Sequence, residues 1–129
     1  MKALSIREPY ATIIKLGLKQ YETRSWKTKY RGPIYIHASS GRIPKTWKQN
    51  KRLMSLVENA SLNFGKLVVK ANLTDCVYMD EEFIKSVKAN ETEYISGFYE
   101  VGRYAWKLEN IEVVNSSEIV KGHLGIWNL

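Results

Sequence analysis

The sequence predicts an α+β domain built on a small sheet or barrel of five or six short strands with flanking helices. Short segments alternate apolar and polar residues, as strands with one buried face do, and three helical segments fall in the first two thirds of the chain. The length of 129 residues, with 44% hydrophobic residues, suits one core, and no repeat or linker divides the chain. We therefore expect residues 1–129 to form a single domain.

The first third of the chain is predicted to contain three strands and one helix. Residues 2–6 read as a strand, and Pro9 opens a helix that Gly17 ends. The run KQYETRSW, residues 19–26, and the run IYIHAS, residues 34–39, both alternate in the manner of strands. A strand pair is expected here.

The rest of the chain continues this alternation of strands and helices. Pro44 is predicted to start a second helix whose polar side carries Lys48, Lys51 and Arg52 at helical spacing. Asp80 is predicted to cap a third helix after a long central strand.

Two strand segments are expected after the third helix. The run RYAWKLENIEVV changes the phase of its alternation by one residue, which predicts a β-bulge at Glu109 and Asn110. The ending GHLGIWNL is predicted to be the last strand.

Positive charge is concentrated in the first half of the chain. Residues 1–53 hold 13 Lys and Arg against two acids, whereas residues 54–129 hold 7 basic and 11 acidic residues. One strongly basic surface is typical of a protein that neutralises a polyanion. The alternative interpretation is a solvent-exposed face whose charge keeps the protein soluble.

Several function classes lack their sequence motifs. A single cysteine, Cys76, allows neither an internal disulfide nor a cysteine metal cluster, which favours a reducing, cytoplasmic location. No phosphate loop, zinc spacing or dinucleotide fingerprint is present, and His37 and His123 alone define no metal site. No uncharged apolar run is long enough to span a membrane. We therefore expect no metal, no cofactor and no membrane association.

Three ionisable residues form the most informative cluster, in the string Gly17-x-Lys19-x-x-Glu22-x-Arg24. Glu22 and Arg24 share a strand face, whereas Lys19 reaches them only if it belongs to the turn before the strand. If the three converge, Glu22 holds two cations, and Arg24 is left to bind a phosphate or base edge. The alternative is a surface ion pair of little energetic weight.

Several blocks of the chain resemble the ASCH domain (activating signal cointegrator homology), a family related in fold to PUA domains. These blocks are SIREPYATII, GLKQYETRSW, YRGPIYIHAS, GFYEVGRYAWKLENIEVV and KGHLGIWNL. The resemblance implies a PUA-like barrel with a cleft that binds RNA or single nucleotides. With the aromatic and basic residues of the first half, the expected binding residues are Ser5, Arg7, Tyr10, Lys19, Glu22, Arg24, Trp26, Lys48, Lys51 and Arg52.

The sequence leaves two other functions open. It also leaves open whether the bound nucleic acid is DNA. Some ASCH-like proteins resemble amidohydrolases acting on N4-acetylcytidine, and others ribonucleases, so Lys19 and Glu22 are the catalytic residues if this chain is an enzyme. Glu22 stands where the amidohydrolase pattern has a threonine, and Thr23 is expected to face away. The sequence does not locate the distant glutamate of that pattern. The third function is a protein-interaction module that uses Lys48, Lys51 and Arg52, with an unknown partner.

Overall fold

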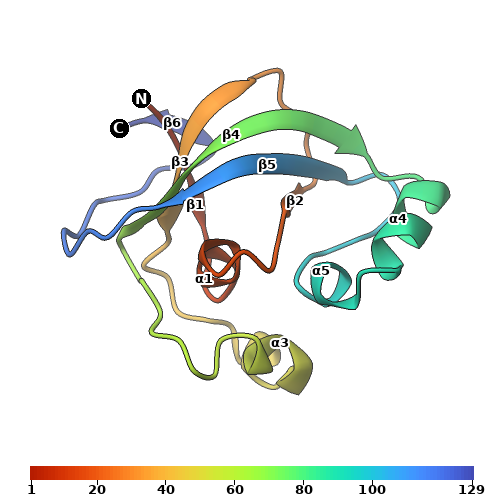
Figure 1. Ribbon diagram of the computed structural model, residues 1–129, viewed down its shortest axis with the longest axis horizontal. Coiled ribbons are helices and arrows are strands. Elements are labelled where there is room, and N and C mark those ends of the chain that lie inside the picture. Colours follow the sequence, from red (N-terminus) through yellow and green to blue (C-terminus); the bar gives the residue numbers. More distant parts are fainter.

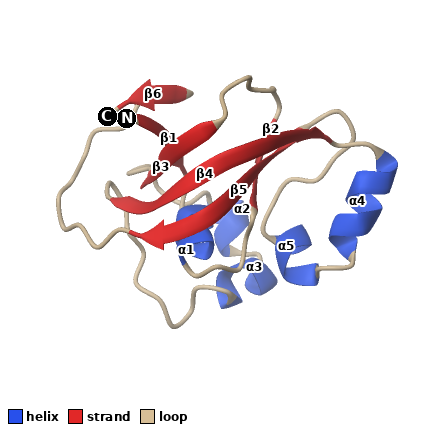
Figure 2. Ribbon diagram, turned by 45° about the horizontal axis from the view of Figure 1, so that its top comes forward, coloured by secondary structure: helices blue, strands red, loops and turns tan.

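The computed structural model describes residues 1–129 as a curled six-stranded sheet whose helices lie on one side (Figures 1 and 2). The strand order is β2-β5-β4-β3-β1-β6, and only the β1–β3 pair is parallel. This confirms the predicted α+β class: the sheet is a half-barrel of the PUA-like type with flanking helices. No helix is long and apolar enough to cross a bilayer.

The elements alternate along the chain much as the periodicity predicts. The strands are β1 (Lys2–Ile6), β2 (Tyr21–Arg24), β3 (Gly32–Ala38), β4 (Leu67–Tyr78), β5 (Tyr104–Val113) and β6 (Ile126–Asn128). The helices are α1 (Tyr10–Lys15), α2 (Lys45–Lys48), α3 (Lys51–Ser55), α4 (Glu81–Lys88) and α5 (Glu91–Ile95).

The core lies between the curled sheet and α1. Ile34 and Ile36 of β3 are fully buried, as are Ile13 and Ile14 of α1. Because each buried aliphatic side chain of this size contributes about 1.5–3 kcal/mol, this contact fixes α1 inside the curl. Trp106 of β5 is also fully buried.

The predicted β-bulge is present in β5. Asn72 pairs with Glu109 and Lys70 with Glu112, so two residues of β5 face the single residue Ala71. Asn110 adopts a φ of 54°, a left-handed conformation that asparagine tolerates better than most residues. The bulge increases the twist of the sheet.

The predicted helix after Pro44 was wrong in its length. Two short helices, α2 and α3, replace it, because the Asn50 side chain accepts a hydrogen bond from the Leu53 backbone N–H and starts a new helix. As a result, Lys48 belongs to one helix and Lys51 and Arg52 to the next. The helix capped by Asp80 is present as α4, whereas α5 was not predicted.

The sheet does not close into a complete barrel. Strand β2 pairs only with β5 and not with β3, so the expected pairing of these two segments was wrong. Strand β6 pairs with β1 only from Lys2 to Leu4. The last residues of β1, Ser5 and Ile6, therefore have no strand partner on their outer side. The open edge between β1 and β2 is where the candidate site lies.

A buried carboxylate ties α1 to a distant loop. Glu8 is fully buried and accepts hydrogen bonds from the Thr12 backbone N–H (2.8 Å), the Thr12 hydroxyl (2.6 Å) and the Asn63 backbone N–H (2.7 Å). These donors lie 4 and 55 residues away in sequence. Glu8 thus sets the position of α1, which carries Tyr10 to the site.

We expect Glu8→Ala to lower the free energy of unfolding by about 2–4 kcal/mol, because buried donors lose their acceptor. Urea unfolding followed by circular dichroism measures the effect. Glu58→Ala, at an exposed position, is the matched control and should change stability by less than about 0.5 kcal/mol. Equal stability of the two variants would show that Glu8 does not hold α1.

Candidate functional site

A pocket of about 640 Å³ opens at the edge between β1 and β2. Its walls come from those two strands, from β3 and the two residues after it, from α1 and α2, and from residues 96–98 and 121–125. Ligand sites of small molecules commonly have this volume. Of the predicted binding residues, those that line it are Ser5, Arg7, Tyr10, Lys19, Glu22 and Arg24.

Arg24 bridges the open edge of the sheet. Its Nε lies 2.9 Å and its Nη2 2.8 Å from Glu22 Oε2, so one carboxylate oxygen receives both contacts. Its Nη2 also donates to the backbone carbonyl of Ser5 at 2.9 Å. The guanidinium therefore joins β2 to β1, where no strand ladder connects them.

The pocket leaves polar atoms of this bridge available. Glu22 Oε1 and Arg24 Nη1 form no hydrogen bond within the protein, and no buried side-chain N or O atom lacks a partner. Both atoms are therefore reached by solvent. The bridge thus keeps one carboxylate acceptor and one charged donor that are not used within the protein.

Lys19 belongs to the turn before β2, which confirms the condition set by its spacing from Glu22. Lys19 is only 3% exposed, and its ammonium group donates to the carbonyl of Ser96 and makes no ion pair with Glu22. Burial lowers the pKa of Lys19, while the charges of Glu22 and Glu93 oppose that shift. Glu22 thus pairs directly with one cation rather than two.

Gly97 is needed beside Lys19. A Cβ at this position would lie 2.6 Å from the Tyr99 ring and 3.2 Å from both Lys19 Nζ and Thr23 Cγ2. Thr23 also lines the pocket and accepts a hydrogen bond from the Phe98 backbone N–H, so the expectation that it faces away was wrong. Residues 96–98 pack against β2, and together with Thr23 they form part of the pocket wall.

Three aromatic rings form one wall of the pocket. Tyr10 contacts Trp47 at 5.1 Å and Phe98 at 5.6 Å between ring centroids. Burial and the charge of Glu22 raise the pKa of Tyr10 to about 12, so its hydroxyl stays protonated at neutral pH. Arg7 lies over the Trp47 ring at 5.4 Å. Aromatic surface and cations therefore share one cavity.

A hydrogen-bond chain holds the C-terminal strap, residues 120–125, against the sheet. His37 Nε2 donates to the Val120 carbonyl at 2.7 Å, which leaves Nδ1 as the acceptor for the Ser5 hydroxyl at 2.9 Å. The Ser5 oxygen accepts in turn from the Trp127 indole at 3.2 Å. The strap places Lys121 and His123 at the pocket.

The family model described as the ASCH domain matches residues 4–122, nearly the whole chain. This chain belongs to the ASCH domain family. The family has a PUA-like fold and generally binds RNA. The comparison with curated proteins finds no match.

Four of the predicted binding residues lie outside the main pocket of this ASCH domain. Trp26 is 41% exposed and packs edge-on against Trp106, whose indole N–H donates to the Trp26 carbonyl at 3.2 Å. Lys48 and Lys51 are exposed on the two short helices, and Arg52 lines a second cavity. The basic surface therefore extends beyond the pocket.

Sequence reasoning missed several residues of the ASCH domain site. Ser96, Phe98 and Lys121 line the pocket, and the buried Glu93 of α5 accepts from the Gln20 backbone N–H at 2.6 Å, beside Lys19. Phe98 had one signal, its place in the family block GFYEVGRYAW. No cluster of three or more His, Cys, Asp or Glu side chains has a metal-binding arrangement.

Gly122→Ala should displace the strap of the ASCH domain. The added Cβ would lie 2.5 Å from Ser5 Oγ and 2.8 Å from the His37 ring, closer than a packed structure allows. We expect a loss of about 1–3 kcal/mol of stability and altered His37 ring resonances in NMR spectra. The control is Gly41→Ala, whose Cβ meets only ordinary contacts. Unchanged His37 resonances would contradict the packing described.

The lowered pKa of Lys19 predicts a pH dependence of stability in the ASCH domain. Between that pKa and the ordinary value of 10.5, the unfolded chain binds a proton that the folded domain does not. The stability of wild type relative to Lys19→Met should therefore rise with pH through this window and be constant below it. Urea unfolding at several pH values measures the difference, and a difference independent of pH would contradict the assignment.

Proposed function

We propose that this ASCH domain binds a nucleotide unit, free or within RNA, in the pocket at the open edge of the half-barrel. The observation that carries the proposal is Arg24, a pocket-lining residue that is fixed by Glu22 and Ser5 and whose Nη1 has no hydrogen-bond partner within the protein. A guanidinium held in place loses little conformational entropy when it binds a phosphate or a base edge.

The charges around the pocket favour an anionic ligand. Arg7, Arg24 and Lys121 line it, and Glu22 is the one acidic side chain among its lining residues. Glu22 already neutralises part of the Arg24 charge. The excess positive charge supports binding of a phosphate, and such binding weakens as salt rises.

The aromatic wall supports binding of a base. Trp47 and Phe98 are only partly covered, and Tyr10 presents a protonated hydroxyl. A base that stacks on an aromatic side chain gains about 1–3 kcal/mol, and each of the four bases has the flat face that this requires. A nucleotide carries both a phosphate and a base, so its binding site requires cations and a stacking surface together. This pocket has both.

Calorimetric titration with the four ribonucleoside 5′-monophosphates tests the proposal. Wild type should bind at least one of them, and Arg24→Gln should weaken that binding about tenfold or more, since a hydrogen bond to a charged group is lost. Circular dichroism checks that the variant is folded. Absence of binding by wild type, or unchanged binding by folded Arg24→Gln, would refute the proposal.

Lys121→Gln tests the electrostatic contribution at the rim. Removal of one exposed cation should weaken binding about two- to fivefold and reduce the slope of log affinity against log salt by about 1. The matched control is Lys29→Gln, an exposed position in the β2–β3 loop that does not line the pocket. If both variants lose affinity equally, only net charge matters and the pocket is not the site.

Hydrolysis in the same pocket is the second candidate function. The specific observation is Lys19, an amine with a pKa lowered by burial, near Glu22 and beside Thr23. A lowered pKa increases the neutral fraction of this amine, and the neutral form is the one that accepts a proton from water or a hydroxyl, as amide or phosphodiester hydrolysis requires. Turnover of N4-acetylcytidine or a short RNA by wild type and its loss in folded Lys19→Gln would support an enzyme, whereas an inactive wild type would remove this candidate.

A further inference from the structure

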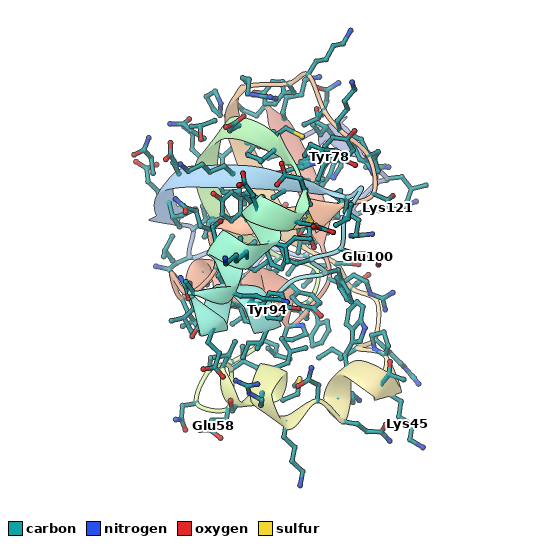
Figure 3. The ribbon with its side chains drawn as sticks, turned by 90° about the vertical axis from the view of Figure 1, so that its right-hand side faces the viewer. Lys45, Glu58, Tyr78, Tyr94, Glu100 and Lys121 are labelled. Atoms are coloured by element: carbon teal, nitrogen blue, oxygen red, sulfur yellow. The ribbon has the colours of Figure 1, made fainter.

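A second cavity, of about 380 Å³, adjoins the nucleotide pocket. Residues from the α2–α3 segment, α5 and the chain after α5 line it, and Gly97 and Phe98 line both cavities. Figure 3 shows Tyr94 and Glu100, two residues of this lining, above the α2–α3 segment marked by Lys45 and Glu58. The two cavities therefore share one wall.

Phe98 is that shared wall. Phe98 is 44% exposed, and its ring contacts Tyr10 and Trp47, at 5.6 and 5.7 Å between centroids, on the side of the first pocket. On the second side, Tyr94 and Tyr99 stack at 5.9 Å with an interplanar angle of 24°. Aromatic rings thus line both sides of the boundary, the arrangement in which successive bases of a single strand stack.

The second cavity also has unused polar groups. Asn50 Oδ1 caps α3, which leaves its side-chain N–H groups as donors, and the Arg52 side chain is 63% exposed. Arg52 pairs with Glu91, an exposed pair of small energetic weight, so its guanidinium is available to a phosphate. Glu100 supplies an exposed acceptor suited to a ribose hydroxyl or base amino group.

We propose that the second cavity binds the nucleotide adjoining the one in the first pocket. The ligand is then a single strand of at least two nucleotides, which crosses Phe98 and places a phosphate near Arg52. This inference rests on the proposed function of the first pocket. It also gives a role to a cation of the basic first half that the first pocket does not use.

Calorimetry with matched monophosphates and homodinucleotides (ApA, CpC, GpG and UpU as ribonucleotides, each with a 5′-phosphate) tests it. For the base bound best, the dinucleotide should bind about tenfold tighter than the monophosphate. Arg52→Gln should weaken dinucleotide binding about fivefold and leave monophosphate binding unchanged. In NMR spectra, the backbone amides of Asn50 and Tyr94 should shift only with the dinucleotide.

Lys29→Gln is the control, and should change the affinity for both ligands by the same small factor. Monophosphate binding with no dinucleotide advantage, or equal effects of Arg52→Gln on both ligands, would overturn the second site and leave the first. No binding of any monophosphate or dinucleotide would overturn both proposals.

Discussion

The contact on which the site depends is the bridge from Arg24 to Glu22 and to the carbonyl of Ser5. Strands β1 and β2 face each other across the open edge of the half-barrel, without a backbone ladder between them. A long, planar cation spans that distance while keeping one nitrogen free. The same side chain therefore connects the two strands and supplies a charged hydrogen-bond donor to the pocket that it lines. The site is thus a consequence of the incomplete barrel.

Around this bridge, close packing keeps charged groups at the pocket. Gly97 lets the chain after α5 approach Lys19, and Gly122 lets the strap approach Ser5 and His37. Each close approach brings a chain segment distant in sequence to the pocket. Burial lowers the pKa of Lys19 and raises that of Tyr10, and both shifts favour the neutral forms.

Local pattern predicted the strands, α1, α4 and the β-bulge at Asn110, because each depends on periodicity, capping or turn residues close in sequence. The approach of Lys19, Glu22 and Arg24 to one pocket was predictable only on the condition that Lys19 precedes the strand, and the pairing of Glu22 with both cations was wrong. The break at Asn50 was missed because a capping side chain inside a helical pattern resembles any polar residue. Phe98, Lys121 and Glu93 reach the site through tertiary packing, which periodicity does not encode.

A crystal structure of the protein grown with a saturating ribonucleoside 5′-monophosphate tests the central claim most directly. The account predicts the nucleotide at the open edge between β1 and β2, within hydrogen-bonding distance of Arg24 and against the aromatic wall. A nucleotide bound on another face, with the pocket holding only water, would contradict it.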